Sequence, residues 1–325
     1  MYWIELNNSF IKQIANRICH LNTMADNIIE DRSMKNTALI LCCLFLGSCS
    51  SFFRAINYSP SIKVREISFL DEESTQNYQF YYSDTIGNEY LRELRQNYGL
   101  DTLTSNLPNE IEKIKAILHW SSNQWEHNGS NTPSKSDALN ILKEAEAGKQ
   151  FRCVEYGILA AASLNSIGIR ARVLSLKTSD VEKIKFGAGH VVTEVYSNDY
   201  FKWIFIDPQF DVLPILNGVP LNAVEFQKAI LVEKQNIELH NSKGKVEQES
   251  LDNYINWIGK YLYFFDVGFD QRIDFSVDKK GYDGKTKLML VPLGVDNPTV
   301  FQREYKIDYC LYTNSINEFY ANPKD

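Results

Sequence analysis

Apolar residues dominate positions 153–167, and this run is the clearest element that the hydrophobic pattern predicts. The run opens on Cys153 and ends at Gly168, as a helix ends at a C-terminal glycine. The pattern therefore predicts a helix whose first residue is Cys153. At that position the unpaired backbone N–H groups and the positive end of the helix dipole favour the thiolate, which is the reactive form of cysteine.

Two alternating apolar runs, at residues 190–196 and 201–207, predict a β-hairpin. If residues 198–199 form a two-residue turn, the numbers of cross-strand partners sum to 397. His190 then lies directly opposite Asp207, with Cβ atoms roughly 5 Å apart. A symmetric four-residue loop would keep this pairing. The carboxylate could then accept a ring N–H, fix the tautomer and stabilise the imidazolium.

Apolar residues at three- and four-residue steps behind Pro108 predict another helix, which reaches towards Trp125. Further helices are expected at residues 88–97 and 223–232. The aromatic stretch 254–265 is expected to pack a C-terminal extension onto the core. The strand-like runs that follow predict a small antiparallel sheet, and they cover residues 271–277, 286–292 and 305–312.

Several segments together resemble the transglutaminase-like superfamily, whose members are relatives of papain-type cysteine peptidases. They are Gly148-Lys149-Gln150-Phe151-Arg152-Cys153, the helix after it, Gly168-Ile169-Arg170-Ala171-Arg172, Gly189-His190 and Trp203 with Asp207-Pro208. The resemblance covers about residues 106–230. It implies that Cys153 is the nucleophile, that His190 is the general base and acid, and that Asp207 orients the histidine.

The resemblance implies an α+β transglutaminase-like, cysteine-proteinase fold, in which the nucleophile-bearing helix packs on an antiparallel sheet. A small β-rich extension would follow at the C terminus. The expected organisation is an upstream segment that is not native at 1–33, a lipoprotein signal peptide at 34–48, a linker and packing segment at 49–105, the catalytic core at 106–235 and the extension at 236–325.

The sequence around the cysteine departs from that of the animal crosslinking enzymes. Phe-Arg-Cys-Val-Glu-Tyr at 151–156 replaces their Gly-Gln-Cys-Trp pattern, and Gln209 follows Pro208 where they have threonine. This argues against crosslinking and favours hydrolysis of amide bonds in peptide or peptide-like substrates. Acyl transfer to an amine and a non-catalytic binding or scaffold role remain as alternatives.

A thiolate that attacks an amide carbonyl creates an oxyanion, which needs hydrogen-bond donors. The backbone N–H of Cys153 is expected to be one of them, because it lies at the helix start. The second donor is expected before the cysteine in the sequence, where the alternatives are Gln150, Trp120, Asn123, Gln124 and Trp125.

The start of the chain predicts where the protein resides. Met34 opens a short basic segment, residues 37–46 form an apolar run too short to span a bilayer, and Leu46-Gly47-Ser48-Cys49 resembles a bacterial lipobox. Cys49 would then be the lipid-modified first residue of the mature protein, and an upstream start codon that is not the true one would account for residues 1–33.

Ser50-Ser51 follow that cysteine, with no aspartate to indicate inner-membrane retention. The expected location is therefore the bacterial cell envelope, lipid-anchored in the outer membrane and facing the periplasm. A surface-exposed location or a Gram-positive host are the alternatives.

Composition and residue spacing limit the kinds of partner and cofactor that the chain is expected to bind. The formal net charge is −7, which argues against nucleic acid. His119 and His127 lie eight residues apart without further residues at ligand spacing, and the acidic residues show no calcium-loop pattern, so neither metal nor cofactor is expected. Two cysteines remain besides those at or before the proposed lipidation site. Cys153 and Cys310 are both expected to be free, because a disulfide between them would disable the nucleophile.

Overall fold

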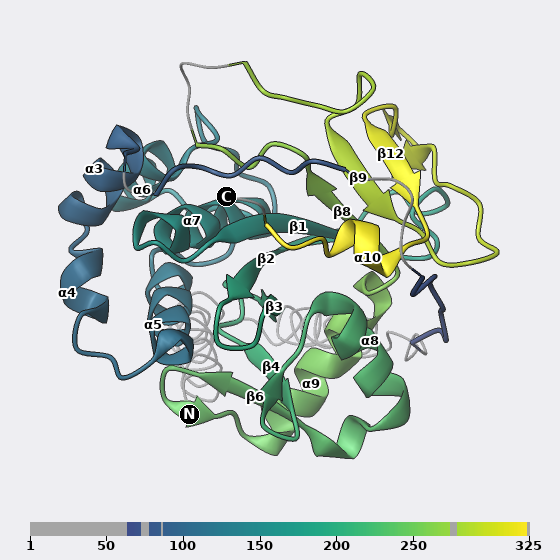
Figure 1. The fold of residues 1–325 in the computed structure, drawn as a ribbon, viewed down its shortest axis with the longest axis horizontal. Helices are drawn as coiled ribbons and strands as arrows, with labels where there is room; N and C mark the ends of the chain where they lie inside the picture. Colours follow the sequence, from purple (N-terminus) through teal and green to yellow (C-terminus); the bar gives the residue numbers. More distant parts are fainter. Residues whose placement is uncertain (1–63, 73–77, 86, 274–277, 324–325) are drawn as a thin grey trace, which may run out of the picture. The chain divides into compact units, whose positions relative to one another are not determined.

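The computed structural model of the chain describes residues 64–72, 78–85, 87–273 and 278–323 (Figure 1). The helices are α3 (Glu89–Asn97), α4 (Leu100–Thr104), α5 (Glu110–Ser122), α6 (Ala138–Glu146), α7 (Cys153–Ser166), α8 (Ala223–Val232), α9 (Gln248–Ile258) and α10 (Ile316–Phe319), with 3-10 turns η1 (Lys234–Asn236) and η2 (Gly259–Tyr261). The strands are β1 (Ala171–Lys177), β2 (Gly189–Ser197), β3 (Lys202–Ile206), β4 (Leu213–Leu216), β5 (Val219–Pro220), β6 (Ile237–Asn241), β7 (Gly244–Lys245), β8 (Phe264–Gly268), β9 (Lys287–Leu290), β10 (Val300–Phe301), β11 (Tyr305–Lys306) and β12 (Cys310–Thr313).

A six-stranded sheet in the order β12-β9-β8-β1-β2-β3 is the centre of the fold. Its strands pair antiparallel, except that β12 runs parallel to β9. Helix α7 packs on β1 and β2, and α3, α5 and α6 pack around it (Figure 1). Helices α8 and α9 share a second apolar core with residues of β1, β2 and β3. The predicted α+β class, with the cysteine-bearing helix on a mainly antiparallel sheet, is therefore confirmed.

Helix α7 has the predicted ends. It begins at Cys153, and Gly168 follows its last turn with a φ of 85°, the left-handed conformation that glycine adopts without strain. Asn165 ties this end to the sheet, because its side chain accepts from the backbone N–H of Ala171 (3.2 Å) and donates to the carbonyl of the same residue (2.9 Å).

Gly157 allows α7 to lie very close to β2. A Cβ atom at this position would be only 3.0 Å from Cγ1 of Val191 and 3.2 Å from the carbonyl oxygen of Val192. The hydroxyl of Thr193 donates to the carbonyl of Gly157 across the same interface (3.1 Å). This close approach brings the start of α7, one turn earlier, towards the strand that carries His190.

The register of the hairpin differs from the prediction by two residues. Partner numbers sum to 399 rather than 397, as in the pair formed by Thr193 and Ile206. The turn occupies residues 198–201, because Phe201 takes a φ of 52° there instead of starting the second strand. His190 and Asp207 are therefore diagonal neighbours. They still share one face, because side chains alternate with a period of two and an even shift preserves the face.

The C-terminal strands do not form the separate small antiparallel sheet that the sequence predicts. Strands β8 and β9 extend the central sheet beyond β1, and β12 completes its edge as a parallel strand. Within the described residues, β10 and β11 form a separate two-stranded sheet in the C-terminal part of the chain. Strands β4, β5, β6 and β7, which come earlier, form a four-stranded sheet. The segments 1–33 and 34–48 and Cys49 lie outside the described residues.

Candidate active site

The first pair of the site joins the two strands of the hairpin. Nε2 of His190 lies 2.7 Å from Oδ2 of Asp207, and both residues are buried, with 3% and 0% of their surfaces exposed. Oδ1 of Asp207 accepts the backbone N–H of Gln209 (3.1 Å) in the tight turn that follows β3. Because Nε2 is engaged by the carboxylate, Nδ1 of His190 is the ring nitrogen left for a second partner.

Cys153 is that second partner. Burial lowers the pKa of His190, but the charge and hydrogen bond of Asp207, together with the hydrogen bond and charge of Cys153, raise it to about 9. Cys153 is half-buried and free, and it is the first residue of α7. The structure thus brings all three residues predicted as catalytic into one chain of contacts.

The first turn of α7 is fixed by a buried acidic residue. Glu155, whose side chain is fully buried, accepts the backbone N–H of Arg152 at Oε2 (3.1 Å) and the Nη2 of the same arginine at Oε1 (2.7 Å). The carboxylate also complements the positive end of the helix dipole. Cys153 is held between these two residues in the sequence, so its backbone position is well defined.

Aromatic side chains from α9, η2 and the turn after β3 cover His190. The ring centroid of Trp257 lies 4.8 Å from that of the imidazole, and those of Tyr261 and Phe210 lie at 5.8 and 6.2 Å. Burial and the charge of Cys153 raise the pKa of Tyr261 to about 12, so this phenol is protonated at neutral pH and lies near the cysteine. The sequence indicated that the stretch 254–265 packs on the core, and its contact with the site emerges only in the structure.

Tyr254 is a residue of the site that the sequence analysis missed. Its hydroxyl donates to Oδ2 of Asp207 at 2.8 Å, the same oxygen that contacts His190. The three- and four-residue steps between Tyr254, Trp257 and Tyr261 were a signal that these residues share one helix face. That signal did not reveal what the face covers.

The five candidate oxyanion donors do not lie in equivalent settings. The amides of Asn123 and Gln124 donate to the carbonyls of His119 (2.6 Å) and Trp120 (2.7 Å) at the end of α5. The ring of Trp120 packs against Tyr98, with centroids 5.9 Å apart. The amides of Asn123 and Gln124 are thus occupied at the C-terminal end of α5, and the ring of Trp120 packs beside them.

The other two candidates flank the cysteine segment. Gln150 donates to Glu126 at 3.3 Å. Trp125 lies with its ring 5.4 Å from that of Phe151 and 4.5 Å from that of Tyr156, and its buried Nε1 has no hydrogen-bond partner among the described residues. A buried N–H without a partner is costly, so its presence beside Phe151 and Tyr156 points to a ligand atom as the missing acceptor.

The two histidines before the cysteine have separate surroundings. Nδ1 of His119 lies 2.7 Å from Oδ2 of Asp211. One side of His127 is exposed, and partial burial of its ring together with the charge of His190 lowers its pKa, which places it at the rim of the site. Within the described residues no group of three or more His, Cys, Asp or Glu side chains is arranged to hold a metal ion.

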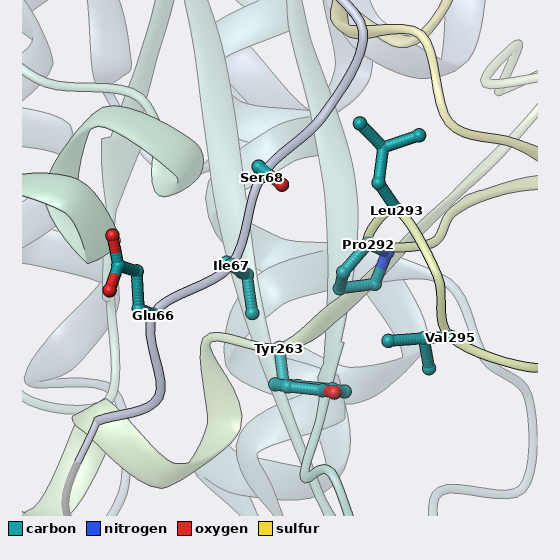
Figure 2. A pocket seen from close by; sticks show the side chains of 7 residues that line it. All are labelled: Glu66, Ile67, Ser68, Tyr263, Pro292, Leu293 and Val295. Carbon is teal, nitrogen blue, oxygen red and sulfur yellow. The ribbon is translucent and has the colours of Figure 1, made fainter.

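A pocket of about 290 Å³ lies elsewhere in the structure. Figure 2 shows it between the segment 66–68 and the residues that follow β9, with Tyr263 at one side. None of its lining residues belongs to the predicted site. They are Glu66, Ile67, Ser68, Tyr263, Pro292, Leu293 and Val295.

Comparison with known proteins supports the class of the site. Residues 100–208 match the family model of the transglutaminase-like superfamily. The predicted resemblance is thereby confirmed for this segment, which contains Cys153, His190 and Asp207. No curated protein sequence matches the chain.

Two solved structures are similar to part of this chain. A candidate cysteine protease from Cytophaga hutchinsonii is 18% identical over 50% of this chain and 55% of its own length, with a TM-score of 0.30. A candidate protease from Parabacteroides distasonis is 14% identical over 48% of this chain and 28% of its own length, with a TM-score of 0.28. The match thus spans about half of the first relative and little more than a quarter of the second.

Proposed function

We propose that the chain is a cysteine hydrolase that cleaves amide bonds in peptide or peptide-like substrates. Cys153 is the nucleophile, His190 the general base and acid, and Asp207 the residue that orients the imidazole. The observation that carries this proposal is the buried 2.7 Å contact between His190 and Asp207, with Cys153 as the other partner of the ring. Imidazolium and thiolate stabilise each other in such a pair.

The first half of the reaction forms a thioester. The thiolate sulfur of Cys153 bonds to the amide carbon, and the tetrahedral oxyanion collapses as the C–N bond breaks. The imidazolium of His190 gives its proton to the departing amine. Asp207 holds the ring in one orientation throughout.

The second half restores the enzyme. His190, now neutral, takes a proton from a water molecule as that water attacks the thioester carbon. The carbon–sulfur bond breaks, a carboxylic acid leaves, and the thiolate–imidazolium pair returns. If an amine replaces water in this step, the product is a new amide, which is the acyl-transfer alternative.

We assign the oxyanion to two donors. The backbone N–H of Cys153 is the first, because the opening N–H groups of a helix have no partner within the helix. The indole N–H of Trp125 is the second, which its lack of a partner and its contacts with Phe151 and Tyr156 support. Gln150 is the less suitable donor, because Glu126 engages its amide.

The test is digestion of a peptide library by residues 50–325, with products identified by mass spectrometry and Cys153→Ser as the inactive control. New carboxyl termini that require Cys153 would support hydrolysis. Incorporation of a labelled amine in their place would support acyl transfer. A non-catalytic binding role would be favoured if neither product forms with any peptide and Cys153 is also unreactive towards alkylation.

We also propose that the protein is anchored to the bacterial cell envelope by a lipid on Cys49 and faces the periplasm from the outer membrane. The lipobox-like Leu46-Gly47-Ser48-Cys49 supports this. No helix in the described part of the chain is both long and apolar enough to cross a bilayer. The anchor can be tested by fractionation of cells that express either the full chain or its Cys49→Ala variant. If the lipid on Cys49 holds the protein, the variant should be released from the membrane fraction.

A further inference from the structure

We propose that Tyr254 is a positioning residue of the active site, which holds Asp207 in the orientation that aligns His190 with Cys153. This inference rests on the proposed function. It assigns part of the active site to α9, a helix that begins 40 residues after the segment that matches the superfamily model.

Asp207 is held by three donors, and two of them share one oxygen. Oδ2 lies 2.7 Å from Nε2 of His190 and 2.8 Å from the hydroxyl of Tyr254, and Oδ1 accepts the backbone N–H of Gln209 at 3.1 Å. Hydrogen bonds to the charged form of a carboxylate stabilise that form. The carboxylate is fully buried, and it can turn only if one of these bonds breaks.

The ring of Tyr254 is itself fixed. It is buried, and its centroid lies 5.3 Å from that of Phe210 and 6.5 Å from that of Phe226 on α8. Burial, with the charge of Asp207, raises the pKa of Tyr254 well above its ordinary value. Its hydroxyl is therefore protonated at every pH at which the enzyme would work, and it acts as a donor and not as an acid or base.

The same face of α9 and η2 continues over the catalytic ring. Trp257 and Tyr261 follow Tyr254 at three- and four-residue steps, and both contact His190. A segment outside the matched core therefore excludes water from His190 and fixes Asp207, the partner of that histidine. Exclusion of water strengthens the interaction between His190 and Asp207.

The titratable groups around His190 come from four parts of the chain. They are Cys153 on α7, Asp207 after β3, Tyr254 and Tyr261 from α9 and η2, and His127 at the rim. Both tyrosines are protonated near neutral pH, because burial raises the pKa of each. A change in the pH dependence of Cys153 therefore reports on the cysteine, the histidine and the aspartate, with His127 as the remaining contributor.

The test is the pH profile of alkylation of Cys153 by iodoacetamide in the Tyr254→Phe variant. This change keeps the ring and removes the hydroxyl. We expect the midpoint of the profile to move upward by about one pH unit and the rate at pH 7 to fall about tenfold, since Asp207 is then free to turn and no longer holds the imidazolium in line with the thiolate. The profile of a Tyr254→Phe, His127→Gln double variant should show the same shift, which removes His127 as its cause.

Tyr320→Phe is the matched control. The hydroxyl of Tyr320 also donates to a buried carboxylate in an ion pair, that of Glu194 with Arg172, at 2.9 Å. Loss of the Tyr320 hydroxyl should destabilise the fold and leave the alkylation profile of Cys153 as it is in the wild type. A structural role for Tyr254 would produce this same result.

Two negative outcomes can be told apart. If wild-type Cys153 reacts in a manner that depends on His190, but Tyr254→Phe leaves the midpoint unchanged, the inference about Tyr254 is wrong and the proposed function stands. If wild-type Cys153 reacts no faster than Cys310 and ignores His190→Ala, the proposed function itself fails, and the inference fails with it.

Discussion

Nε2 of His190 lies 2.7 Å from Oδ2 of Asp207, at a place in the fold where both side chains are buried from solvent. A carboxylate in such a place favours the imidazolium strongly, since little water competes for either charge. Because Nε2 is engaged, the proposed catalytic role of the ring requires exchange of the proton on Nδ1.

The reactivity of Cys153 should depend on its two partners. In residues 50–325 we expect iodoacetamide to alkylate wild-type Cys153 rapidly near neutral pH, and His190→Ala to slow the reaction at least tenfold, because the thiolate loses its counter-ion. Asp207→Asn should have a smaller effect in the same direction. Mass spectrometry of the labelled peptide reports the rate at each pH.

Cys310 provides the internal control for that experiment. It is 3% exposed in β12, and burial raises the pKa of its thiol to about 11 despite the opposing charges of Lys177 and Lys287. It should therefore stay unlabelled in the folded protein at neutral pH and react only after unfolding. Equal labelling of both cysteines would contradict the assignment of Cys153 as an activated thiol.

The unfolding free energy of the protein should depend on pH through the protonation of His190. Its pKa is about 9 in the folded protein against 6.5 in an unfolded chain, so folding favours the protonated form. This contribution is fully present below pH 6.5 and is lost as the pH rises through about 9. We expect the difference in unfolding free energy between the wild type and His190→Gln to fall by about 3 kcal/mol over that interval, as measured by urea denaturation. A flat difference would show that the histidine is neutral in the folded state.

Trp125→Phe should separate bond cleavage from thiol reactivity. The change keeps an aromatic ring beside Phe151 and removes the indole N–H. We expect amide hydrolysis to fall about 100-fold, because one oxyanion donor is lost. Alkylation of Cys153 by iodoacetamide should keep its rate, because displacement of iodide creates no oxyanion.

Trp120→Phe is the control for that variant, because Trp120 packs against Tyr98 and not against Phe151 or Tyr156. It should leave hydrolysis almost unchanged. If Trp125→Phe hydrolyses the substrate as fast as this control does, the second donor is another group.

Gly157→Ala should disturb the alignment of α7 with β2. The new Cβ atom would lie 3.0 Å from Val191 and 3.2 Å from a backbone oxygen that cannot move away easily. We expect a loss of about 1–3 kcal/mol in unfolding free energy and slower alkylation of Cys153, as the helix shifts away from His190. Gly129→Ala, where the nearest atom is at 3.9 Å, should be tolerated in both assays.

The helix that carries Cys153 was predictable in full, because everything that defines it is local. The apolar run, the glycine at its end and the cysteine at its start lie within 16 residues, and the structure has α7 at Cys153–Ser166 with Gly168 in the left-handed conformation. The helix at residues 223–232 was predicted with its final bounds for the same reason. That His190 and Asp207 share a face also followed from the sequence, because the period of two along a strand survives an even change of register.

The register itself was decided by the turn. Phe201 reads as a strand residue by its type, yet it adopts a φ of 52° and belongs to the turn. The choice depends on how β2 and β3 pack against β1 and the two cores, which no window of the sequence contains. The tertiary structure therefore decided that the two side chains meet diagonally.

The sequence by itself determined the candidate nucleophile, its helix and the two strand residues on one face, since each depends on contacts between neighbours in the chain. Only the tertiary structure decided that Tyr254 contacts Asp207, that Trp257 and Tyr261 cover His190, and that β9 and β12 extend the central sheet. Tyr254 and Asp207 are 47 residues apart. Such contacts form because burial of apolar surface selects one arrangement of whole elements, and that selection leaves no periodic pattern in the sequence.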